Sequence, residues 1–273
     1  MPTIDVDGVT LYYEEHGEGP PFVLIQGLGI PGAAWYNQVP EFSARYRVIL
    51  PDNRGSGRSD QTKIEYSVPR MADDVIALLD HLGVERAHVL GLSLGGLIAQ
   101  QLAISYPERV FGLILVSTHP GGPPYLEATG EMWKERLNVV GKTIEQIYRE
   151  ALEWGAAPAF IRERPEEVER FLKMRLQYPQ SGTGFQGQFT AGAAFDAREE
   201  LYRIKAPTLV IHGTEDQVVP PRFGSFIAER IPGARIHWLE GVGHLAFVEA
   251  PSQFNAVVLS FLDEVATKGG GQG

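Results

Sequence analysis

The sequence predicts one α/β domain built on a mostly parallel sheet of eight strands, with a helical cap inserted between strands six and seven. Short, continuous apolar runs alternate with helical segments, which is typical of a parallel sheet covered by helices on both faces. A hairpin pattern precedes these runs, and the strand pattern stops between residues 119 and 205. We therefore expect a core domain in residues 1–118 and 206–267, a cap in 119–205 and a disordered tail in 268–273.

The first two strands are predicted by the turn between them. Asp7-Gly8 separates two alternating runs, Thr3 to Val6 and Val9 to Glu15. A two-residue Asp-Gly turn between such runs is the strongest short signal for a β-hairpin. We therefore expect two antiparallel strands at an edge of the sheet.

Six further strands are predicted by short apolar runs, which are Phe22 to Gln26, Tyr46 to Pro51, Ala87 to Gly91, Gly112 to Ser117, Pro207 to His212 and Ala234 to Leu239. In open parallel sheets, ligands bind in the loops that follow the carboxyl ends of the strands. We therefore expect the functional residues in the loops that begin at Gln26, Asp52, Ser93, Thr118 and Gly213.

Helical periodicity replaces the strand pattern within the predicted cap. Thr143 and Gln146 form a capping box before a helix whose apolar residues recur every three or four positions. Pro165 opens a second helix, and Pro179 ends it. The inserted segment is therefore predicted to be helical.

The composition excludes several classes of partner and site. A formal charge of -10 with no basic run argues against nucleic acid and against an anionic membrane surface as partners. The absence of cysteine excludes disulfides and thiolate metal sites. The N-terminus lacks the pattern of a signal peptide and no apolar run reaches membrane-spanning length, so we expect a cytoplasmic location.

The stretch Gly91-Leu-Ser-Leu-Gly95 carries the strongest chemical signal in the chain. It places a serine between two glycines, after an apolar strand and before a helix-forming run. A nucleophile elbow needs this arrangement, because its strained turn leaves no room for side chains on either side of the serine. The N-terminus of the following helix would also direct backbone N–H groups toward a negative charge beside Ser93.

An acid and a base follow Ser93 in the order that such an elbow requires. Asp216 follows the seventh predicted strand, and His244 follows the eighth. A serine hydroxyl becomes a good nucleophile only when an imidazole takes its proton, and a carboxylate must orient that imidazole. Glu215 is the alternative for the acid.

Four motifs together resemble those of the α/β-hydrolase superfamily over essentially the whole chain. They are Asp52-Asn-Arg-Gly-Ser-Gly-Arg-Ser59, Gly91-Leu-Ser-Leu-Gly-Gly96, Pro207-Thr-Leu-Val-Ile-His-Gly-Thr-Glu-Asp216 and Gly243-His-Leu-Ala-Phe-Val-Glu-Ala-Pro251. The stretch around Ser93 looks closest to carboxylesterases and enol-lactonases, with non-haem haloperoxidases as near relatives. The register of the third motif favours Asp216 over Glu215 as the acid.

The resemblance implies a serine hydrolase that cleaves a carboxylic ester or lactone through an acyl-enzyme intermediate. Its catalytic triad would be Ser93, Asp216 and His244. Members of this fold that use an aspartate nucleophile, such as epoxide hydrolases, are disfavoured because residue 93 is serine.

The resemblance also implies an oxyanion hole made by the backbone N–H groups of Leu28 and Leu94. Family members usually begin the first of these loops with His-Gly, whereas this chain has Gln26-Gly27. We expect the glutamine amide to hydrogen-bond the loop, so that the oxyanion hole is retained.

Six residues near the expected pocket are candidates for substrate binding, namely Gln26, His119, Trp133, Trp154, Phe185 and Phe189. The aromatic residues would line an apolar pocket, or they would pack the cap against the core. We therefore expect a small ester or lactone with an apolar or aromatic group as substrate. No histidines have metal-ligand spacing, so neither a metal nor an organic cofactor is predicted.

Other functional classes remain open. Gly27-Leu-Gly-Ile-Pro-Gly32 matches the G-x-G-x-x-G dinucleotide fingerprint, and Asp52 lies about 20 residues further on, as a ribose-binding acid would. This loop favours a nicotinamide-dependent oxidoreductase, but Pro31 interrupts it and the next segment is too short for the required helix. A haloperoxidase or perhydrolase using the same triad is another alternative, as is a non-catalytic small-molecule binding protein.

Overall fold

The computed structural model describes residues 1–63 and 65–269 and contains one eight-stranded sheet. The strands are β1 (Thr3–Val6), β2 (Val9–His16), β3 (Pro21–Ile25), β4 (Arg47–Pro51), β5 (Ala87–Leu92), β6 (Val110–Val116), β7 (Thr208–Gly213) and β8 (Arg235–Leu239). Their order across the sheet is β1-β2-β4-β3-β5-β6-β7-β8. Strand β2 is antiparallel to both of its neighbours, and the other pairs are parallel, so the predicted fold class is confirmed.

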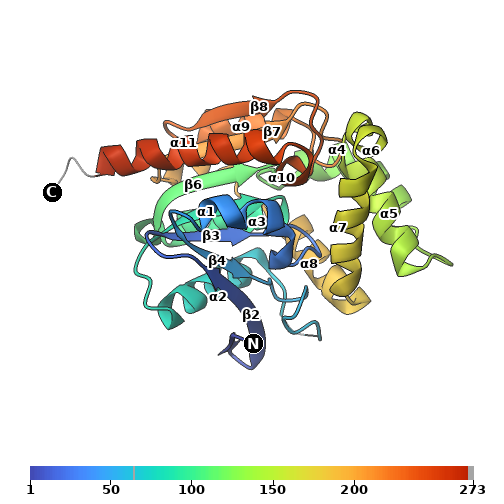
Figure 1. Cartoon of the computed structure of the whole chain (residues 1–273), viewed down its shortest axis with the longest axis horizontal. Coiled ribbons are helices and arrows are strands. Elements are labelled where there is room, and N and C mark those ends of the chain that lie inside the picture. The colour runs from blue at the N-terminus through green and yellow to red at the C-terminus, as the bar shows by residue number, and fades with distance from the viewer. Residues whose placement is uncertain (64, 270–273) are drawn as a thin grey trace.

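Helices connect the strands and cover the sheet. Their bounds are η1 (Gly32–Asn37), α1 (Val39–Phe42), α2 (Val68–His81), α3 (Leu94–Ser105), η2 (Pro107–Arg109), α4 (Pro123–Arg136), α5 (Ile144–Gly155), α6 (Pro158–Glu163), α7 (Pro165–Gln177), α8 (Gly182–Ala194), η3 (Leu201–Arg203), α9 (Arg222–Arg230), α10 (Ala246–Glu249) and α11 (Pro251–Gly269). Figure 1 shows α2 and α11 on opposite sides of the sheet.

Alternate residues of the central strands enter two separate hydrophobic cores. In β3, Val23 and Ile25 pack with residues of α2 and α3, whereas Phe22 and Leu24 pack with residues of α11. Successive side chains of a strand point to opposite faces of the sheet, so a strand covered on both faces must be apolar throughout. This explains the continuous apolar runs from which the strands were predicted.

The predicted N-terminal hairpin is present. Strands β1 and β2 pair around Asp7 and Gly8, both of which have positive φ, at 54° and 80°. A type I′ turn requires positive φ at both central residues, and Asp-Gly adopts it readily. The other strand ends lie within two residues of the predicted ones. Strand β6, for example, begins at Val110, because this residue pairs with Ala87.

The segment between β6 and β7, which we call the cap segment (residues 119–205), forms helices α4 to α8. Figure 1 shows α5, α6 and α7 grouped together beside the sheet. The predicted capping box is confirmed, because the Thr143 hydroxyl accepts from Gln146 N and the Gln146 side chain accepts from Thr143 N. Helix α7 begins at Pro165, as the sequence predicts.

Helix α11 extends to Gly269, so residues 268 and 269 of the predicted tail are helical. The remainder of that prediction, residues 270–273, lies outside the described residues. None of the helices described is long and apolar enough to cross a membrane.

Candidate active site

Ser93 occupies a strained turn between β5 and α3. Its backbone angles are φ 53° and ψ -116°, which a residue with a side chain rarely adopts. A Cβ atom at Gly91 would lie 2.2 Å from the Gly95 carbonyl oxygen, and one at Gly95 would lie 2.2 Å from the Ile25 carbonyl oxygen. Both glycines are therefore required by close backbone contacts, as the elbow pattern predicts.

His244 lies beside Asp216, although the two residues come from different loops. His244 Nδ1 is 2.8 Å from Asp216 Oδ2, and both side chains are buried or nearly so. The loop after β7 carries the aspartate, and the loop after β8 carries the histidine. The parallel pairing of these strands brings the two loops together. Hydrogen bonding to the carboxylate fixes the tautomer that leaves Nε2 of His244 free to accept a proton.

The Asp216 carboxylate is fully hydrogen-bonded. Its Oδ1 accepts from the backbone N–H groups of Val218 and Val219 at 2.9 and 2.8 Å, and its Oδ2 also lies 3.2 Å from His212 Nε2. Burial alone would raise the pKa of Asp216, but the adjacent imidazoles of His244 and His212 hold that pKa below its ordinary value. The carboxylate therefore stays ionised and is able to stabilise a protonated His244.

Glu249 holds the loop that carries His244. Its carboxylate accepts from the backbone N–H groups on either side of the histidine, those of Gly243 and Leu245, both at 2.9 Å. It also accepts from Ala157 N in the cap segment at 2.8 Å. This contribution was not predicted from the sequence, although Glu249 stands within the same motif as His244, Gly243 to Pro251.

The loop after β3 passes directly over Ser93. A Cβ atom at Gly27 would lie 3.2 Å from Ser93 Cβ, so the backbone of this loop lies close to the serine side chain. In the described part of the chain, neither Leu28 N–H nor Leu94 N–H donates a backbone or side-chain hydrogen bond, whereas Gly29 N donates to Gln188 Oε1 at 2.9 Å. Two unpaired donors beside Ser93 are what an oxyanion hole requires.

Gln26, a predicted substrate-binding residue, lines neither of the two cavities at Ser93. The side chain is fully buried, and its Oε1 makes only a long contact of 3.4 Å with Gly27 N. Its backbone carbonyl accepts from Asn53 Nδ2 at 2.9 Å. The Gln26 side chain is therefore enclosed within the fold directly after β3.

Two cavities open at Ser93. The larger has a volume of about 330 Å³, and His244, Trp133, Trp154 and Phe185 are among the residues that line it. The smaller has a volume of about 70 Å³ and is lined by residues that include His119, Phe189 and again Trp133. Five of the six predicted substrate-binding residues therefore lie in a cavity wall.

His119 is a neutral residue in the wall of the smaller cavity. Burial and, to a smaller extent, the nearby His244 together lower its pKa to about 3. Its Nδ1 accepts from Gly121 N at 3.0 Å, and its ring stacks on Tyr125 with 3.3 Å between centroids. The hydrogen bond to Nδ1 leaves the proton of the neutral ring on Nε2.

Arg175 and Arg136 line the larger cavity and were not predicted. Arg175 lies over the Tyr148 ring at 4.0 Å and donates to the Gly29 carbonyl at 3.3 Å, while its buried Nε has no partner among the described residues. Burial lowers the pKa of Arg175. Neither arginine pairs with a carboxylate in the described part of the chain. Helical periodicity could not identify these residues, because whether they face the cavity depends on how α4 and α7 pack over the sheet.

The alternative dinucleotide site is not formed. Asp52 Oδ1 accepts from Gly32 N at 2.6 Å, and Oδ2 accepts from the backbone and side chain of Arg58 at 2.8 and 3.0 Å. Its carboxylate is therefore used within the fold and is not available to a ribose. Gly32 begins the short segment η1 instead of a long helix. The described residues also contain no group of three or more potential ligands that could hold a metal ion.

Known proteins with similar sequences share this fold. A family model of the α/β hydrolase fold matches residues 20–251. The 3-oxoadipate enol-lactonase 2 of Acinetobacter baylyi is 34% identical over 259 residues, covering 94% of each chain. A pimeloyl-acyl-carrier-protein methyl ester esterase of Aeromonas hydrophila is 33% identical, covering 91% of this chain and 98% of that protein.

A solved structure agrees with these sequence matches. The enol-lactonase of Burkholderia xenovorans has a TM-score of 0.86 and 29% identity, covering 96% of this chain and 100% of the other. Further relatives are named as carbamate hydrolases and as a non-haem bromoperoxidase, so the relatives share a fold but not one reaction. The chain belongs to the α/β-hydrolase fold family.

Proposed function

We propose that this protein is a serine hydrolase that cleaves a carboxylic ester or lactone through an acyl-enzyme intermediate. One observation carries the proposal: Ser93 and His244 line the same cavity, and His244 Nδ1 is bound to Asp216. A nucleophile, a base and an orienting acid are the three parts that such chemistry needs.

In the proposed reaction, His244 Nε2 removes the proton of the Ser93 hydroxyl as the oxygen attacks the carbonyl carbon. Asp216 stabilises the imidazolium that forms, because its lowered pKa keeps it negatively charged. His244 then donates the proton to the departing alkoxide, which leaves an ester between Ser93 and the acyl group. Water activated by His244 hydrolyses this ester and regenerates the serine.

The backbone N–H groups of Leu28 and Leu94 stabilise the negative oxygen of each tetrahedral intermediate. Each such donor is worth about 3 kcal/mol of transition-state stabilisation in enzymes where it has been removed. The dipole of α3 adds to this effect, because Ser93 precedes the first residue of that helix.

The substrate class is inferred from the cavity and from the relatives. Relatives named as enol-lactonases and as a methyl ester esterase act on ester bonds, as their names state. The larger cavity is lined chiefly by apolar and aromatic side chains, including Trp133, Trp154 and Phe185. We therefore favour a small ester or lactone that carries an apolar or aromatic group.

Burst kinetics with p-nitrophenyl acetate test the proposal. The wild-type protein should release p-nitrophenol in a burst equal to the concentration of active sites, followed by slower steady turnover. Ser93→Ala should show neither phase, and NADH should bind to neither protein. Equal turnover by Ser93→Ala would refute the mechanism.

A peroxide-dependent activity is the second candidate, because one relative, 29% identical, is named as a non-haem bromoperoxidase. Hydrogen peroxide would replace water as the acceptor of the acyl group from Ser93, giving a peracid. Oxidation of bromide in the presence of acetate and hydrogen peroxide, measured against Ser93→Ala, tests this activity. Bromide oxidation that persists in the mutant would exclude the triad as its source.

A further inference from the structure

The two cavities beside Ser93 share only three wall residues, which are Leu28, Ser93 and Trp133. The larger cavity, of about 330 Å³, lies against helices α4, α5, α7 and α8 of the cap segment. The smaller, of about 70 Å³, lies between α3, α4 and α8. A molecule that reacts at Ser93 therefore has two different spaces into which its two ends extend.

We propose that the smaller cavity binds the acyl group of the ester and that the larger cavity binds the alcohol group. The site would then select a short acyl chain joined to a bulky, apolar alcohol. This inference rests on the proposed serine-hydrolase function and adds to it the orientation and the relative sizes of the two substrate parts.

The position of His244 determines the orientation. When Ser93 Oγ bonds to the carbonyl carbon and the bond to the alkoxy oxygen breaks, that oxygen must take its proton from His244. His244 lines the larger cavity and not the smaller one. The alkoxy oxygen and the group attached to it must therefore lie on the side of the larger cavity.

The acyl chain is directed to the other side. The carbonyl oxygen points toward the N–H groups of Leu28 and Leu94, and the alkoxy oxygen points toward His244. The remaining substituent of the tetrahedral carbon is the acyl chain. Leu94 and its neighbour in the next turn, Leu97, form part of the wall of the smaller cavity, which is the space that remains open from Ser93.

The volumes set the sizes of the two groups. An apolar cavity of roughly 150 Å³ admits a benzene molecule. The smaller cavity, at about 70 Å³, has less than half of that volume and fits a short aliphatic chain such as acetyl or propionyl. The larger, at about 330 Å³, has room for an aromatic ring and its linker.

Two residues in the wall of the smaller cavity, His119 and Gln188, are firmly held. His119 is fixed by the hydrogen bond from Gly121 N and by stacking on Tyr125. Gln188 is buried and accepts from Gly29 N at 2.9 Å, while its Nε2 donates to the Arg54 carbonyl at 2.7 Å. Packed walls of this kind do not expand easily to take a longer chain.

Two phenylalanines on helix α8 provide a matched pair of variants. Phe185 and Phe189 lie one turn apart with their rings stacked, at 5.9 Å between centroids. Phe185 lines only the larger cavity, whereas Phe189 lines only the smaller one. Truncating each to alanine therefore removes an aromatic ring from the wall of one cavity and none from the wall of the other.

The first experiment compares two isomeric esters, 2-phenylethyl acetate and methyl 3-phenylpropanoate, which differ only in the direction of the ester bond. We expect kcat/KM of the wild-type protein to be at least about tenfold higher for the acetate, because a pocket that is too small discriminates by about this factor. Equal values, or a preference for the methyl ester, would overturn the inference. If neither ester is hydrolysed, the serine-hydrolase function itself fails.

The second experiment measures the ratio of kcat/KM for 2-phenylethyl hexanoate to that for the acetate. Phe189→Ala should raise this ratio about tenfold, whereas Phe185→Ala should leave it unchanged. Gly192→Val should lower it, since Gly192 lines the smaller cavity and a Cβ there would lie 3.3 Å from Leu94 Cδ1. A raised ratio in Phe185→Ala, or an unchanged ratio in both of the other variants, would contradict the proposed orientation.

Discussion

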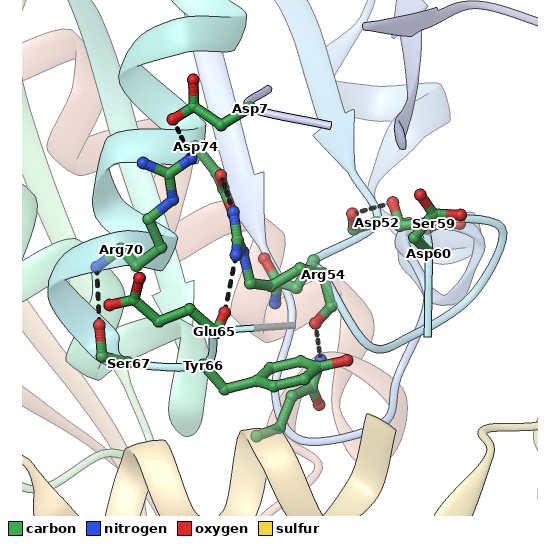
Figure 2. Close-up of polar contacts among 12 residues, drawn as sticks. Asp7, Asp52, Arg54, Ser59, Asp60, Glu65, Tyr66, Ser67, Arg70 and Asp74 are labelled. Carbon is green, nitrogen blue, oxygen red and sulfur yellow. Dashed lines mark hydrogen bonds and ion pairs between the residues drawn. The ribbon is translucent and has the colours of Figure 1, made fainter. Parts of the chain in front are cut away.

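The buried polar cluster around Arg54 and the one around Asp216 differ in what surrounds them. In the first, Arg54 Nε and a terminal nitrogen of Arg54 each donate to Asp74 at 2.6 Å, and a third bond of 2.7 Å reaches the Glu65 carbonyl (Figure 2). In the second, Asp216 binds His244, which lines the cavity of about 330 Å³. The space beside Arg54 and Asp74 is only about 10 Å³, which is at the lower limit for one water molecule.

The comparison shows that buried charge alone does not identify a catalytic site. Each strong donor and acceptor of the Arg54 cluster is paired within the cluster, as Figure 2 shows, so the cluster holds the turn after β4 in place. In the Asp216 cluster, His244 instead lines a cavity of about 330 Å³. The variants below should therefore separate loss of activity from loss of stability.

The largest expected effect is on turnover. Ser93→Ala and His244→Ala should each lower kcat roughly 10⁶-fold, because the members of a triad act as a unit. Thermal unfolding of Ser93→Ala should be nearly unchanged, whereas His244→Ala, which removes a hydrogen bond to the buried Asp216, should unfold at a somewhat lower temperature but remain folded at room temperature. Ester hydrolysis under single-turnover conditions measures the first effect and calorimetry the second. Unfolding of both variants at room temperature would show that the site is structural, like the Arg54 cluster.

Under the proposed mechanism, Asp216→Asn should lower kcat by about 10⁴-fold, since an amide in place of the carboxylate favours the wrong tautomer of His244. The same variant keeps the hydrogen bonds that Val218 N and Val219 N donate to residue 216. Circular dichroism should therefore report a native fold. A loss of less than tenfold would remove Asp216 from the proposed triad.

Arg54→Met should lower the stability of the protein and spare its activity, which is the opposite of what we expect for the triad variants. Removing one partner of a buried ion pair leaves Asp74 unpaired and should lower the free energy of unfolding by about 3–5 kcal/mol, while the folded fraction retains its burst amplitude. Replacing both partners, in Arg54→Met with Asp74→Leu, should restore much of that stability. Urea denaturation measures the free energy of unfolding of the single and of the double variant. If the burst amplitude falls by more than the unfolded fraction of the protein accounts for, Arg54 has a role at the active site.

The sequence predicted the first-order geometry of the site because that geometry depends on local backbone requirements. The glycines around Ser93 and the apolar strands before Asp216 and His244 follow rules of strain and burial that a sequence displays directly. The full burial of the Gln26 side chain was not predicted, because whether that side chain turns into a cavity depends on the path of the loop beyond it. Arg175 was missed because a charged residue on a helix looks the same whether it faces solvent or a cavity.

The sequence also could not predict which aromatic residues line which of the two cavities. Phe185 and Phe189 stand four positions apart in one helix, and periodicity places them on the same face. Only the packing of α8 between α3 and the rest of the cap segment separates their surroundings.

The smallest expected effect is a pH dependence of stability that arises away from the triad. Burial lowers the pKa of His88 to about 4 in the folded chain, against 6.5 for a free histidine. The unfolded chain therefore binds this proton first as the pH falls, and stability should decrease from about pH 6.5 to pH 4 by about 1.4 kcal/mol per pH unit. His119 contributes with the same sign, because its pKa is lowered to about 3.

His88→Leu should therefore make the free energy of unfolding less dependent on pH without changing kcat. Urea denaturation of the wild type and the variant at several pH values between 4 and 7 measures the difference in slope. Identical slopes would show that His88 is not held neutral by its surroundings, which include the rings of Phe22, Tyr46 and Phe111.

The assignment of Ser93 as the nucleophile is tested most directly by finding which serine reacts with a fluorophosphonate. Ser117 provides an internal control, because it also follows a parallel strand, also has positive φ, at 45°, and is buried, yet it lines neither cavity at Ser93. Peptide mapping by mass spectrometry should locate one phosphonyl group per chain, on Ser93, and none on Ser117. Labelling of Ser117 or another serine, or no labelling, would contradict the assignment of Ser93 as the nucleophile.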